Sequence, residues 1–308
     1  MARRVWIDLP ELVRHQVEEQ LGSPVVAATS QASGFSPGSA DRCVLEDGRR
    51  VFIKAVCADV NPDSVNIHRR EAHVLSLLPA SLPAPRLLGM VDTGDWVVLI
   101  LEDVDGCQPT WEDGQLEAAL DAVGQLSHAI IPADQFTPLE EAMADNYAGW
   151  TKVDTGLLPY DMNTNQWITN HIGLLADLAA EAVRRSTGTS LVHGDLRADN
   201  ILFRNSDGQA MLLDWPWAQV GSPWFDPISL LVNVLLLRPG FDIDQTLATH
   251  PVFDGMPDGT AECFFAGLGA YFTYQATQPP VPGITGLRTF QRDQGVVVLD
   301  WLRHRLDL

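Results

Sequence analysis

Short apolar runs separated by turn signals make up most of the first third of the chain. Apolar residues recur at helical spacing from Leu9 to Leu21, and a strand is expected to begin at Val25. The pair Asp47-Gly48 is typical of a hairpin turn between two further strands. Strands are predicted at 44–45, 51–56, 86–91 and 96–101. We therefore expect a β-rich lobe here.

The rest of the chain shows mainly helical spacing. One helix is also expected beside the strands, over 62–78, where Pro62 suits the first turn. A short strand is predicted at 190–192, and Asn205 to Gly208 is typical of a hairpin turn. That hairpin would join strands at 201–203 and 210–213, and helices are predicted over 115–131, 140–150, 165–185 and most of the chain from 227.

Acidic residues and a glycine interrupt the pattern from Glu102 to Gly106. We place the boundary between two lobes there. The expected organisation is an N-terminal lobe over 1–101, a hinge over 102–106 and a C-terminal lobe over 107–308. A β-rich lobe with one main helix, followed by an α-rich lobe, is an α+β fold.

Length and composition are those of an ordinary globular protein. A chain of 308 residues can bury a substantial core, and 46% apolar with 19% charged residues is a usual balance. The four cysteines are scattered without a C-x-x-C pair, so neither a zinc site nor a disulfide framework is indicated. No signal-peptide core or membrane span is apparent. We expect a cytoplasmic protein that is a monomer or a homodimer.

The net charge of −20 narrows the class of partner. Phosphate backbones select basic surfaces, so the charge argues against nucleic acid, and it argues equally against an anionic membrane. It is compatible with a cationic small molecule, which an acidic field would attract. The same charge also serves solubility, and both interpretations stay open.

The most informative feature is a short polar motif. Residues 193–200 read His-Gly-Asp-Leu-Arg-Ala-Asp-Asn. Asp214 directly follows the predicted strand at 210–213. Phosphoryl transfer from a nucleotide to a hydroxyl needs a carboxylate to orient and deprotonate that hydroxyl, and oxygen ligands to hold Mg²⁺ on the phosphates. Asp195, Asn200 and Asp214 supply these groups in the order of the kinase pattern H-x-D-x-x-x-x-N followed by a metal-binding Asp.

With these motifs, the chain resembles the aminoglycoside phosphotransferase and choline-kinase-like family, the small-molecule branch of the protein-kinase fold. The family pattern appears in residues 193–200, in Asp214-Trp215 and in the Gly-x-x-x-x-Asp segment from Gly221 to Asp226. The resemblance covers most of the chain. It implies a bilobal protein-kinase-like fold with a β-rich N-lobe.

The resemblance also implies roles around the motif. Asp195 would accept or orient the hydroxyl proton. Arg197 would stabilise charge on the transferring phosphoryl group, although a surface salt bridge is an equally good interpretation. His193 would support the loop by hydrogen bonding, and Asp226 would accept hydrogen bonds from the loop backbone.

The donor nucleotide, ATP or GTP, is expected to be bound by a charged pair and a metal ion. Lys54 lies in the apolar run 51–56 and would bind the phosphates while pairing with Glu71 on the predicted helix. Asn200 and Asp214 would hold Mg²⁺ through oxygen, as this hard ion requires.

Further nucleotide contacts are expected from two loops. The turn-rich segment 33–40 stands where the fold covers the phosphates, with Gly34 and Ser36 as candidate contacts. It is not a G-x-G-x-x-G sequence, so it is a weak signal. The backbone of Glu102 and Val104 in the hinge would read the edge of the nucleobase, which leaves ATP and GTP both open.

The acceptor is less determined. Members of the family phosphorylate small-molecule hydroxyls, many on amines that carboxylates would meet. The candidate carboxylates are Glu140, Glu141, Asp145, Asp154, Asp161 and Glu262. The aromatic residues Trp215, Trp217, Trp224 and Phe225 could line the acceptor site, and at least two of them are expected in the core.

The expected function is transfer of the γ-phosphate to an aminoglycoside or another hydroxylated antibiotic, which would confer resistance by inactivating it. The first alternative is a metabolic kinase for choline, ethanolamine, a hydroxy-amino acid or an amino sugar. An alternative of another class is a catalytically silent nucleotide-binding module. A protein kinase is disfavoured because no A-P-E segment stands between Asp214 and Asp226.

Overall fold

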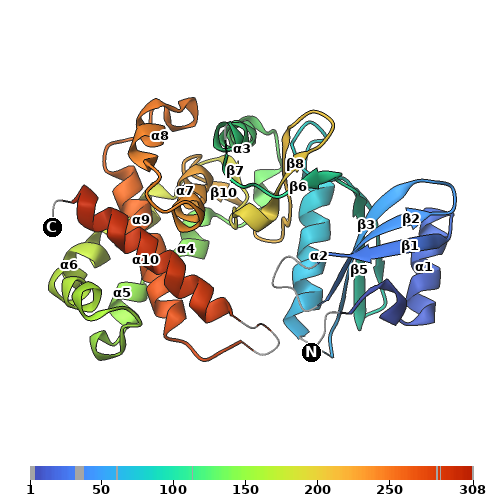
Figure 1. Cartoon of the computed structure of the whole chain (residues 1–308), viewed down its shortest axis with the longest axis horizontal. Helices are drawn as coiled ribbons and strands as arrows, with labels where there is room; N and C mark the ends of the chain where they lie inside the picture. The colour runs from blue at the N-terminus through green and yellow to red at the C-terminus, as the bar shows by residue number, and fades with distance from the viewer. Residues whose placement is uncertain are drawn as a thin grey trace. The chain divides into compact units, whose positions relative to one another are not determined.

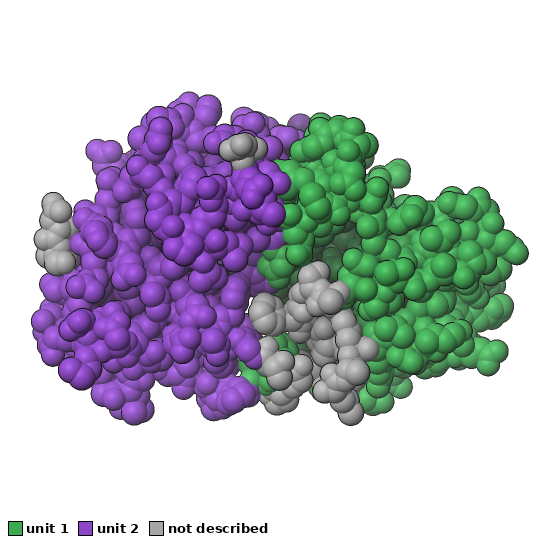
Figure 2. Space-filling view, viewed as in Figure 1, with its two compact units in different colours: residues 1–108, 199–217, 281–285 green, residues 109–198, 218–280, 286–308 purple. Residues whose placement is uncertain are grey.

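The computed structural model of the chain describes residues 4–31, 38–59, 62–112, 114–281, 284 and 286–306. The chain divides into two compact units, coloured separately in Figure 2. Unit 1 comprises residues 1–108, 199–217 and 281–285, and unit 2 comprises 109–198, 218–280 and 286–308. Neither unit is one continuous stretch. The predicted hinge falls inside unit 1, and the two predicted lobes stay a prediction.

The main sheet of unit 1 has five antiparallel strands in the order β1-β2-β3-β5-β4. The turn between β2 and β3 contains Gly48 with a φ of 86°, a left-handed conformation that glycine adopts without strain. The strands are β1 (Val25–Ser30), β2 (Ser39–Leu45), β3 (Arg50–Cys57), β4 (Leu87–Asp92) and β5 (Trp96–Glu102).

The two faces of this sheet differ because successive strand residues point to opposite sides. Ile53 of β3 packs in an apolar core with Val13 of α1 (Glu11–Leu21). Lys54, the next residue, reaches α2 (Pro62–Leu77) instead. Figure 1 shows the sheet between these two helices. One face is thus a core, and the other carries charge.

Unit 1 also contains a small sheet in the order β6-β8-β9. Its strands are β6 (Gly106–Cys107), β8 (Ile201–Arg204) and β9 (Ala210–Leu212). The hairpin predicted around Asn205 to Gly208 is confirmed by the pairing of β8 with β9. Strand β6 was not predicted, because two residues are too few to show alternation.

Unit 2 is mainly helical. Helix α9 is buried along most of its length and packs against α6 and α10. The helices are α3 (Gln115–Gly124), α4 (Leu139–Tyr147), α5 (Gly149–Lys152), α6 (Met162–Arg185), α7 (Phe225–Leu237), α8 (Ile243–Thr249), α9 (Thr260–Ala276) and α10 (Leu287–Arg305). A two-stranded sheet pairs β7 (Ser190–Val192) with β10 (Gln219–Gly221). Short 3-10 turns lie at 125–128, 133–135, 155–157 and 251–253 in unit 2, and at 6–8 in unit 1.

Three predicted elements need correction. The helix expected over 115–131 ends as an α-helix at Gly124, and Ile131 precedes Pro132, a position that disfavours helical backbone. The helix expected over 140–150 is two short helices that meet at Ala148. Helix α6 begins three residues earlier than expected because Asp161 caps it.

Among the described residues, no helix combines the length and the apolar character needed to cross a bilayer.

Candidate active site

Lys54 lies at the centre of an ion-pair cluster in unit 1. Its Nζ atom donates to Glu71 Oε1 at 2.7 Å and to Asp214 Oδ1 at 2.8 Å. The strand β3 supplies the lysine, α2 supplies the glutamate, and Asp214 follows β9 closely. The contact between Lys54 and Glu71 expected from the sequence is therefore present. Its role in phosphate binding stays a prediction.

The cluster combines one cation, Lys54, with two carboxylates, Glu71 and Asp214. Burial alone would lower the pKa of Lys54, but the attraction of Asp214 and Glu71 outweighs burial and raises that pKa. Burial raises the pKa of Glu71, and the Lys54 ammonium opposes the rise. Lys54 is consequently charged at neutral pH and able to attract phosphate oxygens.

Asp214 and Asn200, the expected metal ligands, both belong to unit 1. Asp214 has a left-handed φ of 67°, which costs on the order of 1 kcal/mol for a residue other than glycine. The Leu213 N–H donates to the Asn200 carbonyl oxygen at 2.8 Å, which brings the two backbone segments side by side. Carboxylate and amide oxygens suit Mg²⁺, so this donor pair fits the expected ion.

Lys54 and Asp214 line a pocket of about 430 Å³ that lies within unit 1. This volume is in the usual range for small-molecule sites. Its apolar lining comes from Phe52, Leu101, Val104, Leu202 and Leu213. Apolar walls beside a fixed cation suit a molecule with a flat apolar part and an anionic part, as a nucleotide has.

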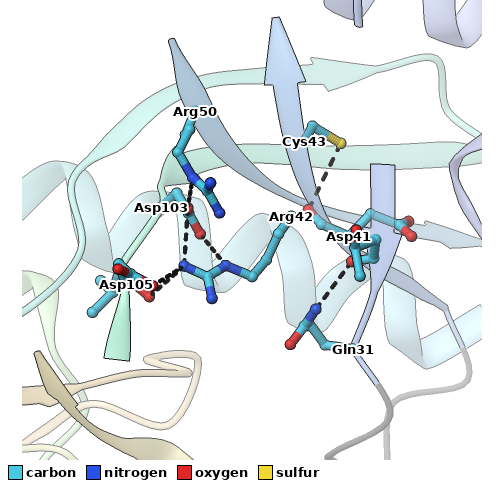
Figure 3. A network of polar contacts seen from close by, with 9 residues as sticks. Gln31, Asp41, Arg42, Cys43, Arg50, Asp103 and Asp105 are labelled. Atoms are coloured by element: carbon cyan, nitrogen blue, oxygen red, sulfur yellow. Dashed lines mark hydrogen bonds and ion pairs between the residues drawn. The ribbon is translucent and has the colours of Figure 1, made fainter. Parts of the chain in front are cut away.

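A second charged network, drawn in Figure 3, lies beside this pocket. Arg42 Nε donates to Asp103 Oδ1 at 2.7 Å, and Arg50 Nε donates to Asp103 Oδ2 at 2.9 Å. Arg42 Nη2 reaches Asp103 Oδ2, Asp105 Oδ1 and the Val104 carbonyl oxygen at 3.1, 3.1 and 3.3 Å. For this segment only backbone contacts with the nucleobase were predicted, so the side-chain network is new. Arg42 was missed, although it lies opposite Phe52 in the pairing of β2 with β3. Its side chain is therefore on the same face of the sheet as Phe52 and Lys54, which line the pocket.

His68 is a further buried group that sequence patterns did not single out. It lies on α2, and its Nδ1 atom is 3.0 Å from the Ser64 carbonyl oxygen. Burial, together with the charge of Lys54, lowers the pKa of His68 to about 4. His68 is therefore neutral at pH 7 and adds no charge behind the cluster.

Two other candidates in the hinge line the same pocket, whereas two in the turn-rich segment cannot be placed. Glu102 and Val104 are both lining residues. The Glu102 carboxylate accepts a hydrogen bond from Arg86 Nε at 3.0 Å. Gly34 and Ser36 lie outside the described residues, so their predicted contacts with phosphate stay predictions.

In unit 2, Asp226 holds the segment that contains the His-Gly-Asp motif. Its Oδ2 atom accepts from the His193 N–H at 2.5 Å, and its Oδ1 atom accepts from the Gly194 N–H at 3.0 Å. Burial raises the pKa of Asp226 to about 6, although both hydrogen bonds lower it. Asn233 on the same helix accepts from the Ala198 N–H at 2.9 Å. The contacts of Asp226 are of the kind expected for it. The hydrogen bond that Asn233 accepts from the same segment was not predicted.

Asp195 is partly exposed at the end of this motif. Arg197 Nη1 donates to Asp195 Oδ1 at 3.0 Å, and the Arg197 guanidinium lies 5.7 Å from the ring centroid of Phe290. The Asp195 N–H donates to His193 Nδ1 at 3.3 Å. His193 is buried, and its predicted support of the loop stays a prediction. Arg197 thus touches the expected catalytic carboxylate.

Most carboxylates proposed to meet a cationic acceptor make local contacts. Such contacts stabilise helix starts, turns or surface pairs. Within unit 2, Asp145 pairs with Lys152, Asp154 accepts from the Gly156 N–H, Asp161 accepts from the N–H groups of Asn163 and Thr164, and Glu262 pairs with Arg305. The structure therefore adds no support for a cationic acceptor.

The aromatic candidates divide between core and surface. Trp215 and Phe225 are buried, which confirms that at least two of them belong to the core. Trp217 is 40% exposed, and the Arg70 guanidinium lies 5.5 Å from its ring centroid.

Comparison with known proteins decides the family. The model of the phosphotransferase enzyme family matches residues 34–258. The chain belongs to this phosphotransferase family. The resemblance inferred from the motifs is thereby confirmed, and so is phosphotransferase chemistry as the activity of the family.

A mouse protein (Mus musculus), acyl-CoA dehydrogenase family member 10, is 24% identical over 203 residues. The match covers 59% of this chain but only 18% of that protein, so the chain spans less than a fifth of its length.

Solved structures confirm the α+β, kinase-like fold class. A thermostable mutant of aminoglycoside phosphotransferase APH(4)-Ia, in complex with ADP and hygromycin B, has a TM-score of 0.61 at 16% identity, with 94% of this chain and 98% of that chain covered. An ethanolamine kinase of Plasmodium vivax has a TM-score of 0.56 at 8% identity, with 94% and 86% covered. At these identities the likeness concerns the fold alone.

Proposed function

We propose that this phosphotransferase moves the γ-phosphoryl group of ATP or GTP to a hydroxyl group of a small molecule. The observation that carries the proposal is the position of Lys54, bound to both Glu71 and Asp214 at the lining of the unit 1 pocket. A lysine held between two carboxylates keeps its charge in a fixed place. Phosphate oxygens can share such a cation through charge-assisted hydrogen bonds.

In the proposed reaction, the acceptor hydroxyl oxygen attacks the γ-phosphorus while its proton passes to the carboxylate of Asp195. The bond between the γ-phosphorus and the β–γ bridging oxygen breaks, and the nucleoside diphosphate leaves with that electron pair. Arg197, which binds Asp195 at 3.0 Å, orients this carboxylate and offers positive charge to the transferring group.

Asn200 and Asp214 are proposed to hold Mg²⁺, which would neutralise charge on the β- and γ-phosphates when bound. The support is the chemistry of their oxygens and the backbone hydrogen bond that joins their segments. Lys54 would then share Asp214 with the bound ion.

For the acceptor we propose an aminoglycoside or another hydroxylated antibiotic, so that phosphorylation would inactivate it. The fold shared with the hygromycin-bound aminoglycoside phosphotransferase supports this choice. The fold shared with an ethanolamine kinase supports the runner-up, a metabolic kinase for choline, ethanolamine, a hydroxy-amino acid or an amino sugar.

The test is acceptor-dependent release of ADP and GDP in the presence of Mg²⁺. The panel contains aminoglycosides, peptide and nucleoside antibiotics, choline, ethanolamine and amino sugars. We expect a hit that disappears in Asp195→Asn and persists in Asp177→Asn, a matched change at an exposed position of α6. If the protein binds nucleotide but turns over no acceptor of the panel, fractions of a cell extract are assayed as acceptors. Nucleotide binding with no turnover in these fractions either would identify a silent nucleotide-binding module.

A further inference from the structure

Arg42 presents a fixed guanidinium to the pocket of unit 1. It is a lining residue, and it donates to Asp103 through both Nε and Nη2. The Asp103 side chain is only 3% exposed and is also bound by Arg50. A buried carboxylate that is bound through both Nε and Nη2 holds the plane of the Arg42 guanidinium in one orientation.

The charges of this network cancel. Arg42 and Arg50 face the carboxylates of Asp103 and Asp105. The network therefore imposes no net charge on a ligand in the pocket. What it offers is a directed donor.

That donor is the Nη1 atom of Arg42. The hydrogen bonds of Arg42 to Asp103, Val104 and Asp105 use Nε and Nη2. An arginine has two more N–H groups on Nη1. In Figure 3 this third nitrogen points away from Asp103 and Asp105.

The register of the sheet separates Arg42 from the phosphate-binding cluster. Arg42 pairs with Phe52, whereas Ala40 pairs with Lys54. Two residues along an antiparallel strand amount to about 7 Å. Lys54 therefore serves one end of the pocket, and Arg42 lies beside the apolar lining and the Val104 carbonyl. A nucleobase would occupy this second end.

We propose that Arg42 donates from Nη1 to the 6-keto oxygen of a purine and makes guanosine nucleotides the preferred phosphoryl donor. Guanine presents O6 and N7 as neighbouring acceptors that suit an arginine. Adenine carries an amino donor at the same position, which would face the guanidinium donor without forming a bond. This inference rests on the proposed function, because it assumes that the pocket binds the donor nucleotide.

The experiment measures equilibrium affinities for GTP, ITP and ATP with Mg²⁺ by calorimetry, in the wild type and in Arg42→Ala and Arg50→Ala. ITP keeps the 6-keto oxygen and lacks the 2-amino group of guanine. We expect the wild type to bind GTP and ITP about tenfold or more tightly than ATP, as one charged hydrogen bond allows. Arg42→Ala should abolish this preference by weakening GTP and ITP.

Arg50→Ala is the matched control, since Arg50 binds the same Asp103 but is not among the described residues that line the pocket. It should keep the preference. Equal wild-type affinities for the three nucleotides, or equal effects of the two substitutions on the preference, would overturn the inference. Arg42→Gln, which keeps a donor for Asp103, replaces Arg42→Ala if thermal unfolding shows that the alanine variant does not fold. A wild type that binds none of the nucleotides would refute the proposed function itself.

Discussion

The two units stabilise their buried carboxylates in different ways. In unit 1, side-chain cations bind two of these carboxylates: Lys54 binds Glu71, and two arginines bind Asp103. In unit 2, the peptide N–H groups of His193 and Gly194 bind the buried carboxylate of Asp226. A cation neutralises the charge, whereas peptide dipoles stabilise it without neutralising it.

This difference matches the two tasks that we propose. A cation such as Lys54 can exchange or share its partners when phosphate arrives, so unit 1 can respond to a ligand. Two peptide N–H groups bound to Asp226 fix the backbone of the motif, so that Asp195 is oriented before any substrate binds. The substitutions below test this division, from the largest expected effect to the smallest.

Asp195→Asn should separate catalysis from nucleotide binding. We expect kcat to fall by about 10²- to 10⁴-fold, because an amide cannot accept the hydroxyl proton. The affinity for ATP or GTP should stay within about twofold, because the nucleotide contacts are proposed for unit 1. Turnover with the identified acceptor and nucleotide titration provide the two measurements. Asp177→Asn should change neither, and a parallel loss of nucleotide affinity in Asp195→Asn would contradict the division.

Lys54→Met should affect both binding and stability in unit 1. Nucleotide affinity should fall about tenfold or more, since the phosphates lose their cation. The free energy of unfolding should fall by about 3 kcal/mol, because Glu71, with a side chain 2% exposed, stays buried without that cation. Denaturant titration measures this loss.

The double variant Lys54→Met with Glu71→Gln distinguishes the two effects. It should recover much of the lost stability, because no charge is then buried unpaired. It should not recover nucleotide affinity. If the double variant is no more stable than Lys54→Met, the cost does not come from the charge of Glu71.

Asp226→Asn should change how stability depends on pH. The folded pKa of Asp226, about 6, lies above its ordinary value of 3.8, so its stabilising contribution is complete below pH 3.8 and is lost as pH rises through 6. The asparagine does not titrate. The wild-type free energy of unfolding, minus that of the variant, should therefore fall by about 2 to 3 kcal/mol between pH 4 and pH 7. Urea titrations across this range test it, and a constant difference would mean that the peptide N–H groups offset the effect of burial on the pKa of Asp226.

Asp161→Ala should have the smallest effect, about 1 kcal/mol of stability, because it removes the N-cap of α6. For a chain of this size the melting temperature should fall by roughly 2 to 4 °C. Asp177→Ala, at an exposed position of the same helix, should change it less. The KM of a cationic acceptor should not change in Asp161→Ala. A raised KM with an unchanged melting temperature would instead indicate that Asp161 contacts the acceptor.

Much of unit 1 follows from local sequence. The strands around Asp47-Gly48, the helix from Pro62 and the place of Lys54 within a strand were predictable, because alternation and turn chemistry act over a few residues. The short strands β6 and β10 were not, since two or three residues carry no period. The end of the helix at Gly124 was also missed, because the apolar spacing continues past it.

The sequence by itself determined the α+β class and the family motif from His193 to Asn200, because both depend on short-range period and on residue types at short spacing. The pairing of Lys54 with Glu71 was implied by the resemblance to the kinase fold. Only the tertiary structure decided which of the many carboxylates are used, and for what. Asp103 meets Arg42 across 61 positions of sequence, and Asp226 meets His193 across 33. A carboxylate's role depends on which donors the packed backbone brings within about 3 Å of it, and no local pattern encodes that distance.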